Sequence, residues 1–181
     1  MRVAQCVRAL WETGRDVFLR RDLAMLFGGG RSGCRTVERL ASDGLLERAC
    51  RGVYVFPYAR VPECSADRVY RVATALRRGE WVFESLESAA SEWGLISQVP
   101  VGRLTLMTTG RAGTFRTTCG TIEFTHTAMD PLEIAHGTVA RRGNPVPIAS
   151  REMTLRCLRR RGRSLGLLEE AREKEGAPGW I

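Results

Sequence analysis

The chain has 181 residues, which allows one large domain or two small ones, and its hydrophobic content of 44% excludes a disordered protein. Its formal net charge of +8 favours a polyanionic partner, either nucleic acid or an acidic surface. A GC-rich coding bias explains much of the preference for arginine over lysine, but it does not explain the excess of basic over acidic residues.

The chain begins with a predicted helix over residues 2–13. Val3, Val7, Leu10 and Trp11 recur there at the three- and four-residue spacing that places apolar side chains on one face. We expect this helix to pack beneath the two helices that follow it.

Two short helices are predicted next, with three glycines between them. Residues 20–27 form the first, and Gly28–Gly30 end it because glycine is costly inside a helix. Ser32 is placed to cap the second by accepting hydrogen bonds from the backbone amides that follow it. This second helix runs to about Ser42 and ends at Gly44, a common residue for a left-handed C-terminal cap.

A hairpin is predicted directly after this helix. Residues 45–49 and 53–56 have the composition of two short strands. The turn between them contains Gly52, which can supply the positive φ that a tight turn requires. Arg48 and Arg51 lie on or next to the tip of the hairpin.

Three helices followed by a hairpin are the plan of a winged helix-turn-helix, so double-stranded DNA is the expected partner. In that fold the outer face of the last helix enters the major groove, where arginine bonds to guanine and serine or threonine contacts bases or phosphates. Arg48 and Arg51 are expected to meet the DNA backbone or the minor groove. The alternative is that these arginines are only solvated surface residues. The expected DNA contacts are Arg31, Ser32, Arg35, Thr36, Arg39, Ser42, Arg48 and Arg51.

Two prolines, Pro57 and Pro62, predict an extended connector after the hairpin. We therefore expect a DNA-binding domain over residues 1–58 and a second domain over residues 59–181. The second domain is expected to open with a helix over residues 65–78.

The second domain is predicted to be a small α/β domain with a short, mostly antiparallel sheet, which gives the whole chain an α+β fold. A short strand at residues 81–83 and a helix capped by Ser85 precede three β-rich runs at residues 103–109, 114–118 and 121–125. The alternation of polar and apolar residues in the first of these runs indicates a half-buried antiparallel strand.

The last long helix begins at Ser150 and carries a cluster of arginines. Its members are Arg156, Arg159, Arg160, Arg161 and Arg163. This cluster leaves open an RNA-binding or protein-interaction module. It also fits the solvated face of a helix near a subunit contact.

Neither a metal site nor an enzyme is expected. The six cysteines form no C-x-x-C pair, and His126 and His136 are the only histidines, so no metal or cofactor is assigned. Cys119 lies in a turn, but no base accompanies it to make a nucleophile. Scattered thiols indicate a reducing cytoplasm, and the lack of a long apolar run predicts no signal peptide and no membrane partner.

Several short segments occur in an order that is typical of one known family. They are Asp22-Leu23-Ala24, Gly44-Leu45-Leu46, Arg51-Gly52-Val53-Tyr54, Ser88-Ala89-Ala90, Trp93-Gly94-Leu95, Ser97-Gln98-Val99-Pro100, Thr108-Thr109-Gly110-Arg111 and Gly120-Thr121-Ile122-Glu123-Phe124. On these segments, residues 15 to 160 resemble the AbiEi family of antitoxins and transcriptional regulators from type IV toxin–antitoxin systems. The Arg-Gly-Val-Tyr segment combined with the Gln-Val-Pro loop is the most specific part of this resemblance.

The resemblance implies a DNA-binding domain followed by an α/β domain. It implies that the first domain represses its own operon by binding inverted repeats, as a monomer or a homodimer. It also implies that the second domain helps to neutralise a nucleotidyltransferase-like toxin without a stable complex. The family's last helices start near residues 147–152, and little follows them here, which leaves open a solitary mobile-element regulator without antitoxin activity.

Overall fold

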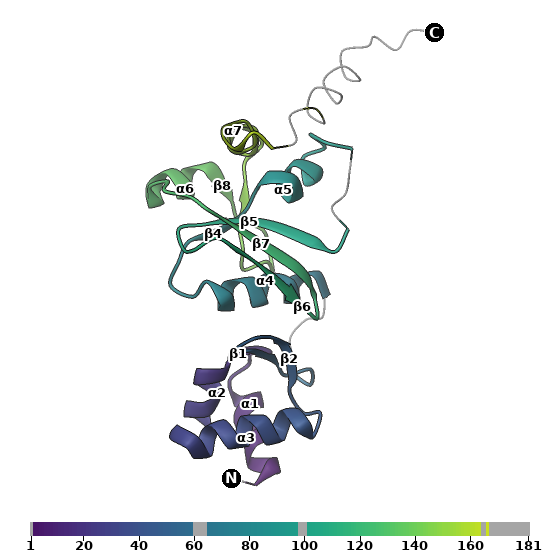
Figure 1. Cartoon of the computed structure of the whole chain (residues 1–181), viewed down its shortest axis with the longest axis vertical. Coiled ribbons are helices and arrows are strands. Elements are labelled where there is room, and N and C mark those ends of the chain that lie inside the picture. Colours follow the sequence, from purple (N-terminus) through teal and green to yellow (C-terminus); the bar gives the residue numbers. More distant parts are fainter. Residues whose placement is uncertain (1, 60–64, 98–100, 164–165, 167–181) are drawn as a thin grey trace, which may run out of the picture. The chain divides into compact units, whose positions relative to one another are not determined.

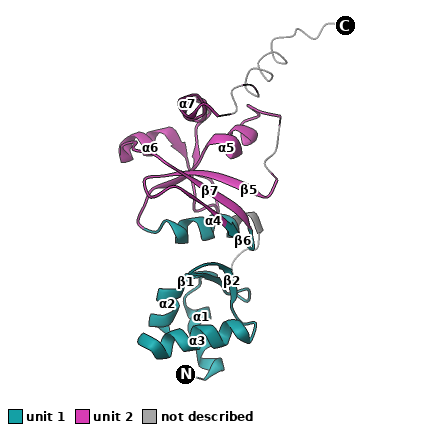
Figure 2. Ribbon diagram, viewed as in Figure 1, with its two compact units in different colours: residues 1–78, 116–119 teal, residues 79–115, 120–181 magenta. Residues whose placement is uncertain are grey.

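The computed structural model describes residues 2–59, 65–97, 101–163 and 166. These residues form an α+β protein with seven helices and two sheets. The chain divides into two compact units, residues 1–78 with 116–119 and residues 79–115 with 120–181 (Figure 2). Within the described ranges, no helix is both long and apolar enough to cross a membrane.

The first unit contains four helices and a small sheet (Figure 1). Its elements are α1 (Val3–Glu12), β1 (Val17–Leu19), α2 (Arg20–Leu26), α3 (Gly30–Ser42), β2 (Glu47–Cys50), β3 (Val53–Val55) and α4 (Ser65–Leu76). The sheet is antiparallel and has the order β1-β3-β2.

The hairpin predicted after α3 is confirmed, since β2 and β3 pair antiparallel and Gly52 in their turn has a φ of 83°. Strand β1 was not predicted, because three apolar residues are too few to show an alternation. The backbone amide of Phe56 donates to the Asp16 carbonyl at 2.7 Å, and that of Arg20 donates to the Gly52 carbonyl at 2.8 Å. These bonds place the start of α2 beside the β2–β3 turn.

Helices α1, α2 and α3 bury apolar side chains in one core with the sheet. The members of this core are Cys6, Leu10, Phe18, Leu23, Phe27, Val37, Leu40, Leu46, Tyr54 and Phe56. Val3 and Trp11, which were expected on the buried face of α1, are exposed instead. The buried face of this helix is centred on Cys6 and Leu10.

Helix α3 begins earlier than predicted and packs closely on α2. Gly29, with a φ of 73°, precedes the helix, so the expected cap at Ser32 is wrong and Ser32 lies in the first turn. A Cβ at Gly33 would lie 2.0 Å from the Ala24 carbonyl oxygen, so the absence of a side chain lets the helices approach. The predicted end of α3 is confirmed, because Gly44 has a φ of 74°.

Helix α4 belongs to the first unit, although we expected it to open the second domain. Asp16 is 1% exposed and accepts hydrogen bonds from Arg71 Nε and Nη2, both at 2.8 Å. Arg68 Nε adds a third bond at 3.4 Å. These bonds tie α4 to the start of β1. Part of the predicted connector, residues 60–64, lies outside the described residues.

The second unit is built on a six-stranded sheet with the order β6-β7-β5-β4-β9-β8. Its strands are β4 (Val82–Glu84), β5 (Arg103–Thr108), β6 (Gly113–Thr117), β7 (Gly120–His126), β8 (Thr138–Val139) and β9 (Ile148–Ala149). The sheet is mixed, since β5 runs parallel to β7 and β4 runs parallel to β9, while β4 and β5, and β8 and β9, pair antiparallel. The expected half-buried character of β5 is also wrong, because residues 104–108 are all buried.

Three helices cover one face of this sheet: α5 (Leu86–Glu92), α6 (Pro131–Gly137) and α7 (Arg151–Arg161) (Figure 1). Their apolar residues meet Phe83 of β4 and Met107 of β5 in a second core. The predicted start of α7 is confirmed, since Ser150 Oγ accepts a hydrogen bond from the Met153 amide at 3.2 Å. The Gln98-Val99-Pro100 loop lies outside the described residues.

Candidate functional site

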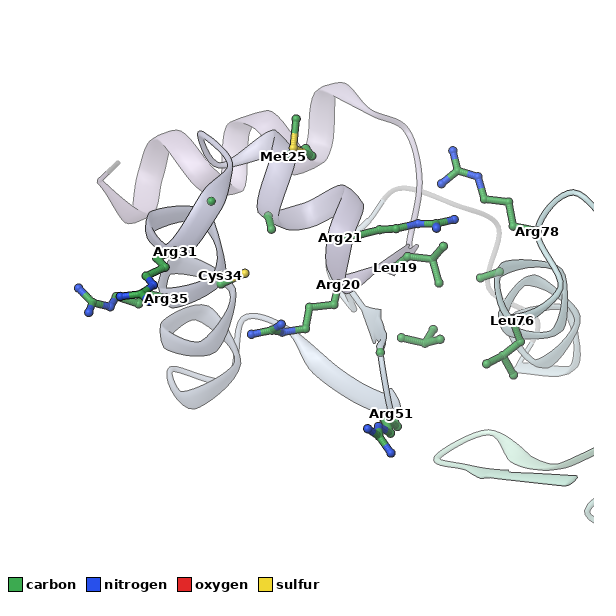
Figure 3. A pocket seen from close by; sticks show the side chains of 15 residues that line it. Leu19, Arg20, Arg21, Met25, Arg31, Cys34, Arg35, Arg51, Leu76 and Arg78 are labelled. Atoms are coloured by element: carbon green, nitrogen blue, oxygen red, sulfur yellow. The ribbon is translucent and has the colours of Figure 1, made fainter. Parts of the chain in front are cut away.

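An arginine-lined groove of about 1030 Å³ lies within the first unit (Figure 3). The start of α2, the first turns of α3, the β2–β3 turn and the end of α4 line it. Its apolar lining includes Leu19, Ala24, Met25, Val53 and Leu76. Its basic residues are Arg20, Arg21, Arg31, Arg35, Arg51 and Arg78.

Three of these arginines form no ion pair with any acidic residue that the structure describes. Arg31 and Arg35 are four residues apart on α3, so they share one side of the helix, and Figure 3 shows both extending in the same direction. Arg51 occupies the β2–β3 turn and is exposed. In the part of the chain that the structure describes, none of the three has an acidic partner. The groove therefore attracts anions.

Acidic residues hold the other arginines of the groove in place. Arg20 Nη2 lies 2.6 Å from Glu38 Oε1, and this hydrogen bond raises the pKa of the Arg20 guanidinium above its ordinary value. Arg78 Nη1 lies 2.6 Å from Asp22 Oδ2, and Arg21 Nε lies 3.8 Å from Asp22 Oδ1. Asp22 thus draws two arginines to one end of the groove, where Figure 3 shows them pointing toward each other.

The structure places most of the expected DNA contacts at the surface. The exposed ones are Arg31, Ser32, Arg35, Arg39, Ser42, Arg48 and Arg51. Thr36, which was expected to contact DNA, is not available for that contact. It is only 8% exposed, and its hydroxyl donates to the Ser32 carbonyl at 3.1 Å. Arg31, Arg35 and Arg51 line the groove. Arg39, Ser42 and Arg48 do not.

Sequence reasoning missed the arginines that α2 and α4 bring to the groove. Arg20 and Arg21 begin α2, where basic side chains oppose the positive end of the helix dipole. Because this position does not favour helix stability, it could have indicated from the sequence that Arg20 and Arg21 have another role. Arg78 follows α4 and carried no such signal, because only the folding of α4 onto the sheet brings it here.

The arginine cluster of α7 is partly used in internal ion pairs. Arg156 Nη2 lies 2.8 Å from Glu133 Oε1. Arg163 bridges Glu87 at 2.9 Å and Glu123 at 2.6 Å. Burial alone would lower the pKa of Arg163, but the hydrogen bonds to Glu123 and Glu87 outweigh this effect and raise the pKa above its ordinary value. These pairs leave less of the cluster for an external polyanion.

The described residues contain no group of three histidine, cysteine or acidic side chains that could hold a metal ion. The cysteines in the same ranges are free thiols: Cys6, Cys34, Cys50, Cys119 and Cys157. Cys64 lies outside those ranges. In comparisons with protein-family models and with curated proteins, nothing matches this chain.

Proposed function

We propose that this protein is a sequence-specific DNA-binding regulator of the AbiEi type, and that residues 3–55 form a winged helix-turn-helix. In this proposal α3 is the recognition helix and the β2–β3 hairpin is the wing. The arginine-lined groove carries the proposal, because Arg31, Arg35 and Arg51 offer positive charge without acidic partners in the described chain.

The proposed binding mode gives α3 and the wing different roles. Arg35 and Arg39, on the exposed face of α3, enter the major groove and donate paired hydrogen bonds to guanine O6 and N7. Arg51 on the wing contacts phosphates, which fixes orientation without reading sequence. The start of α2 lies beside the wing turn, where Arg20 is paired with Glu38.

A gel-shift assay with the intergenic DNA upstream of the gene tests this proposal. Arg35→Ala and Arg39→Ala should each weaken operator binding by about 1–3 kcal/mol and relax the sequence preference. Arg51→Ala should weaken binding evenly across sequences. Arg8→Ala is the control, since Arg8 is exposed on α1 and lies outside the groove. Equal affinity for operator and scrambled DNA at physiological salt would contradict the proposal.

We extend the proposal to repression of the protein's own operon through an inverted repeat, since two recognition helices fit half-sites one helical turn apart. The resemblance of the second unit to AbiEi proteins further supports counteraction of a nucleotidyltransferase-like toxin. The gene directly downstream tests that role. A nucleotidyltransferase-like reading frame there supports it, and another kind of gene favours a solitary regulator.

A further inference from the structure

The exposed side of α3 carries one acidic residue among its basic and hydroxyl residues. Arg31, Arg35, Glu38 and Ser42 are separated by four, three and four residues, so they form one stripe along the helix. Glu38 lies in the middle of this stripe, and its side chain is 60% exposed. A carboxylate there repels DNA phosphates, and its ion pair with Arg20 offsets part of that repulsion.

Arg20 of α2 holds the Glu38 side chain in a defined position. Arg20 Nη2 donates to Glu38 Oε1 at 2.6 Å. The Arg20 backbone is itself fixed, because its amide donates to the Gly52 carbonyl in the hairpin turn at 2.8 Å. The second carboxylate oxygen, Oε2, has no hydrogen-bond partner among the residues that the structure describes. It is therefore available to accept a bond from outside the protein.

An ionised carboxylate only accepts hydrogen bonds, so it selects among base edges in the major groove. Guanine presents two acceptors there, and thymine presents one acceptor and a methyl group. Adenine presents a donor beside the N7 acceptor, which repels the carboxylate. Cytosine presents only the N4 amino donor. Among the four bases, cytosine is thus the best partner for Glu38.

We propose that Glu38 is a specificity-determining residue that accepts a hydrogen bond from cytosine N4 in the operator, and that Arg20 is the positioning residue that orients its carboxylate. This inference rests on the proposed DNA-binding function. Glu38 then reads one base while Arg35, on the same stripe, reads a neighbouring guanine.

The test is selection of sites from a random double-stranded DNA library by the full chain, followed by affinity measurements on single-base variants of the consensus. The wild type should prefer cytosine about tenfold at one position. Glu38→Ala should lose that preference, keep the others and bind random DNA more tightly at low salt. Glu38→Gln should shift the preference to adenine, because glutamine pairs with adenine N6 and N7.

Glu12→Gln is the matched control. Glu12 lies on α1, is 64% exposed and pairs with Arg8 at 2.9 Å, so its replacement changes the net charge equally outside the groove. This variant should retain the base preference of the wild type. Unchanged thermal unfolding of each variant shows that folding is not the cause of an altered preference.

Arg20→Gln tests the positioning role. It should weaken the cytosine preference at the position read by Glu38 and leave the other positions unchanged. An equal loss at every position would show that Arg20 acts only on the DNA backbone. An unchanged cytosine preference in both Glu38 variants would overturn the role of Glu38 while the DNA-binding function stands. A wild type that enriches no consensus would overturn that function as well.

Discussion

At the scale of single residues, Cys157 shows how burial controls thiol chemistry. It lies on the buried face of α7, and burial raises the pKa of its thiol, although the neighbouring Ser85 and nearby arginines act in the opposite direction. A raised pKa in the folded state favours the protonated form. The resulting stabilisation is present below the ordinary thiol pKa and is lost as the pH rises through the raised value.

We predict that Cys157 reacts slowly with iodoacetamide at pH 8, because the thiolate is the nucleophile. Cys34 is the internal control, since it is half-buried on α3. Peptide mass spectrometry should show Cys157 reacting more slowly than Cys34, because burial keeps the Cys157 thiol protonated and also shields it from the reagent. Urea should abolish the difference. Equal rates in the folded protein would contradict the prediction.

Two residues of α3, Thr36 and Glu38, show how much of the site could be predicted. Thr36 was selected because its hydroxyl can contact DNA, yet it lies beside Val37 on the buried face. Glu38 was not among the expected contacts, although helical rotation places it in line with Arg35. The helical periodicity that placed Arg35 and Arg39 at the surface also places Thr36 on the buried side and Glu38 on the exposed side.

At the scale of elements, the crossing of α2 and α3 depends on Gly33. We predict that Gly33→Ala destabilises the first unit by about 1–3 kcal/mol, because its Cβ would meet the backbone of Ala24 and force the helices apart. Ser32→Ala, an exposed change in the same turn, should alter stability by at most about 0.5 kcal/mol. Thermal unfolding followed by circular dichroism measures both. Equal melting temperatures would show that the crossing tolerates a methyl group.

The helices were largely predictable because apolar residues recur at helical spacing in most of them. The strands were harder, for physical reasons that differ between them. Strand β1 is too short to show a pattern. Strand β5 alternates in sequence, but it is buried on both faces and pairs in parallel with β7. The place of α4 depends on Asp16 and Arg71, a contact between distant residues that no local pattern reveals.

At the scale of the whole molecule, the net charge of +8 indicated a polyanionic partner without locating where it binds. Part of that charge lies at the groove, which is lined by six arginines from α2, α3, the β2–β3 turn and the end of α4. Sequence could assign three of them, Arg31, Arg35 and Arg51, because they lie on a predicted helix face or hairpin. The others required knowledge of how the elements fold together.

This concentration of charge gives the proposed DNA complex a measurable salt dependence. Each neutralised phosphate releases counterions, so log Kobs should fall with log salt concentration by a slope of about −0.9 per phosphate. Arg51→Ala should make the slope shallower by about 0.9, since Arg51 is expected to contact a phosphate. Arg35→Ala should change the slope less, because its expected partner is a base. Titrations of operator DNA at several salt concentrations separate the two roles. A slope for Arg51→Ala equal to that of the wild type would show that the hairpin does not neutralise the backbone, and the wing assignment would then fail.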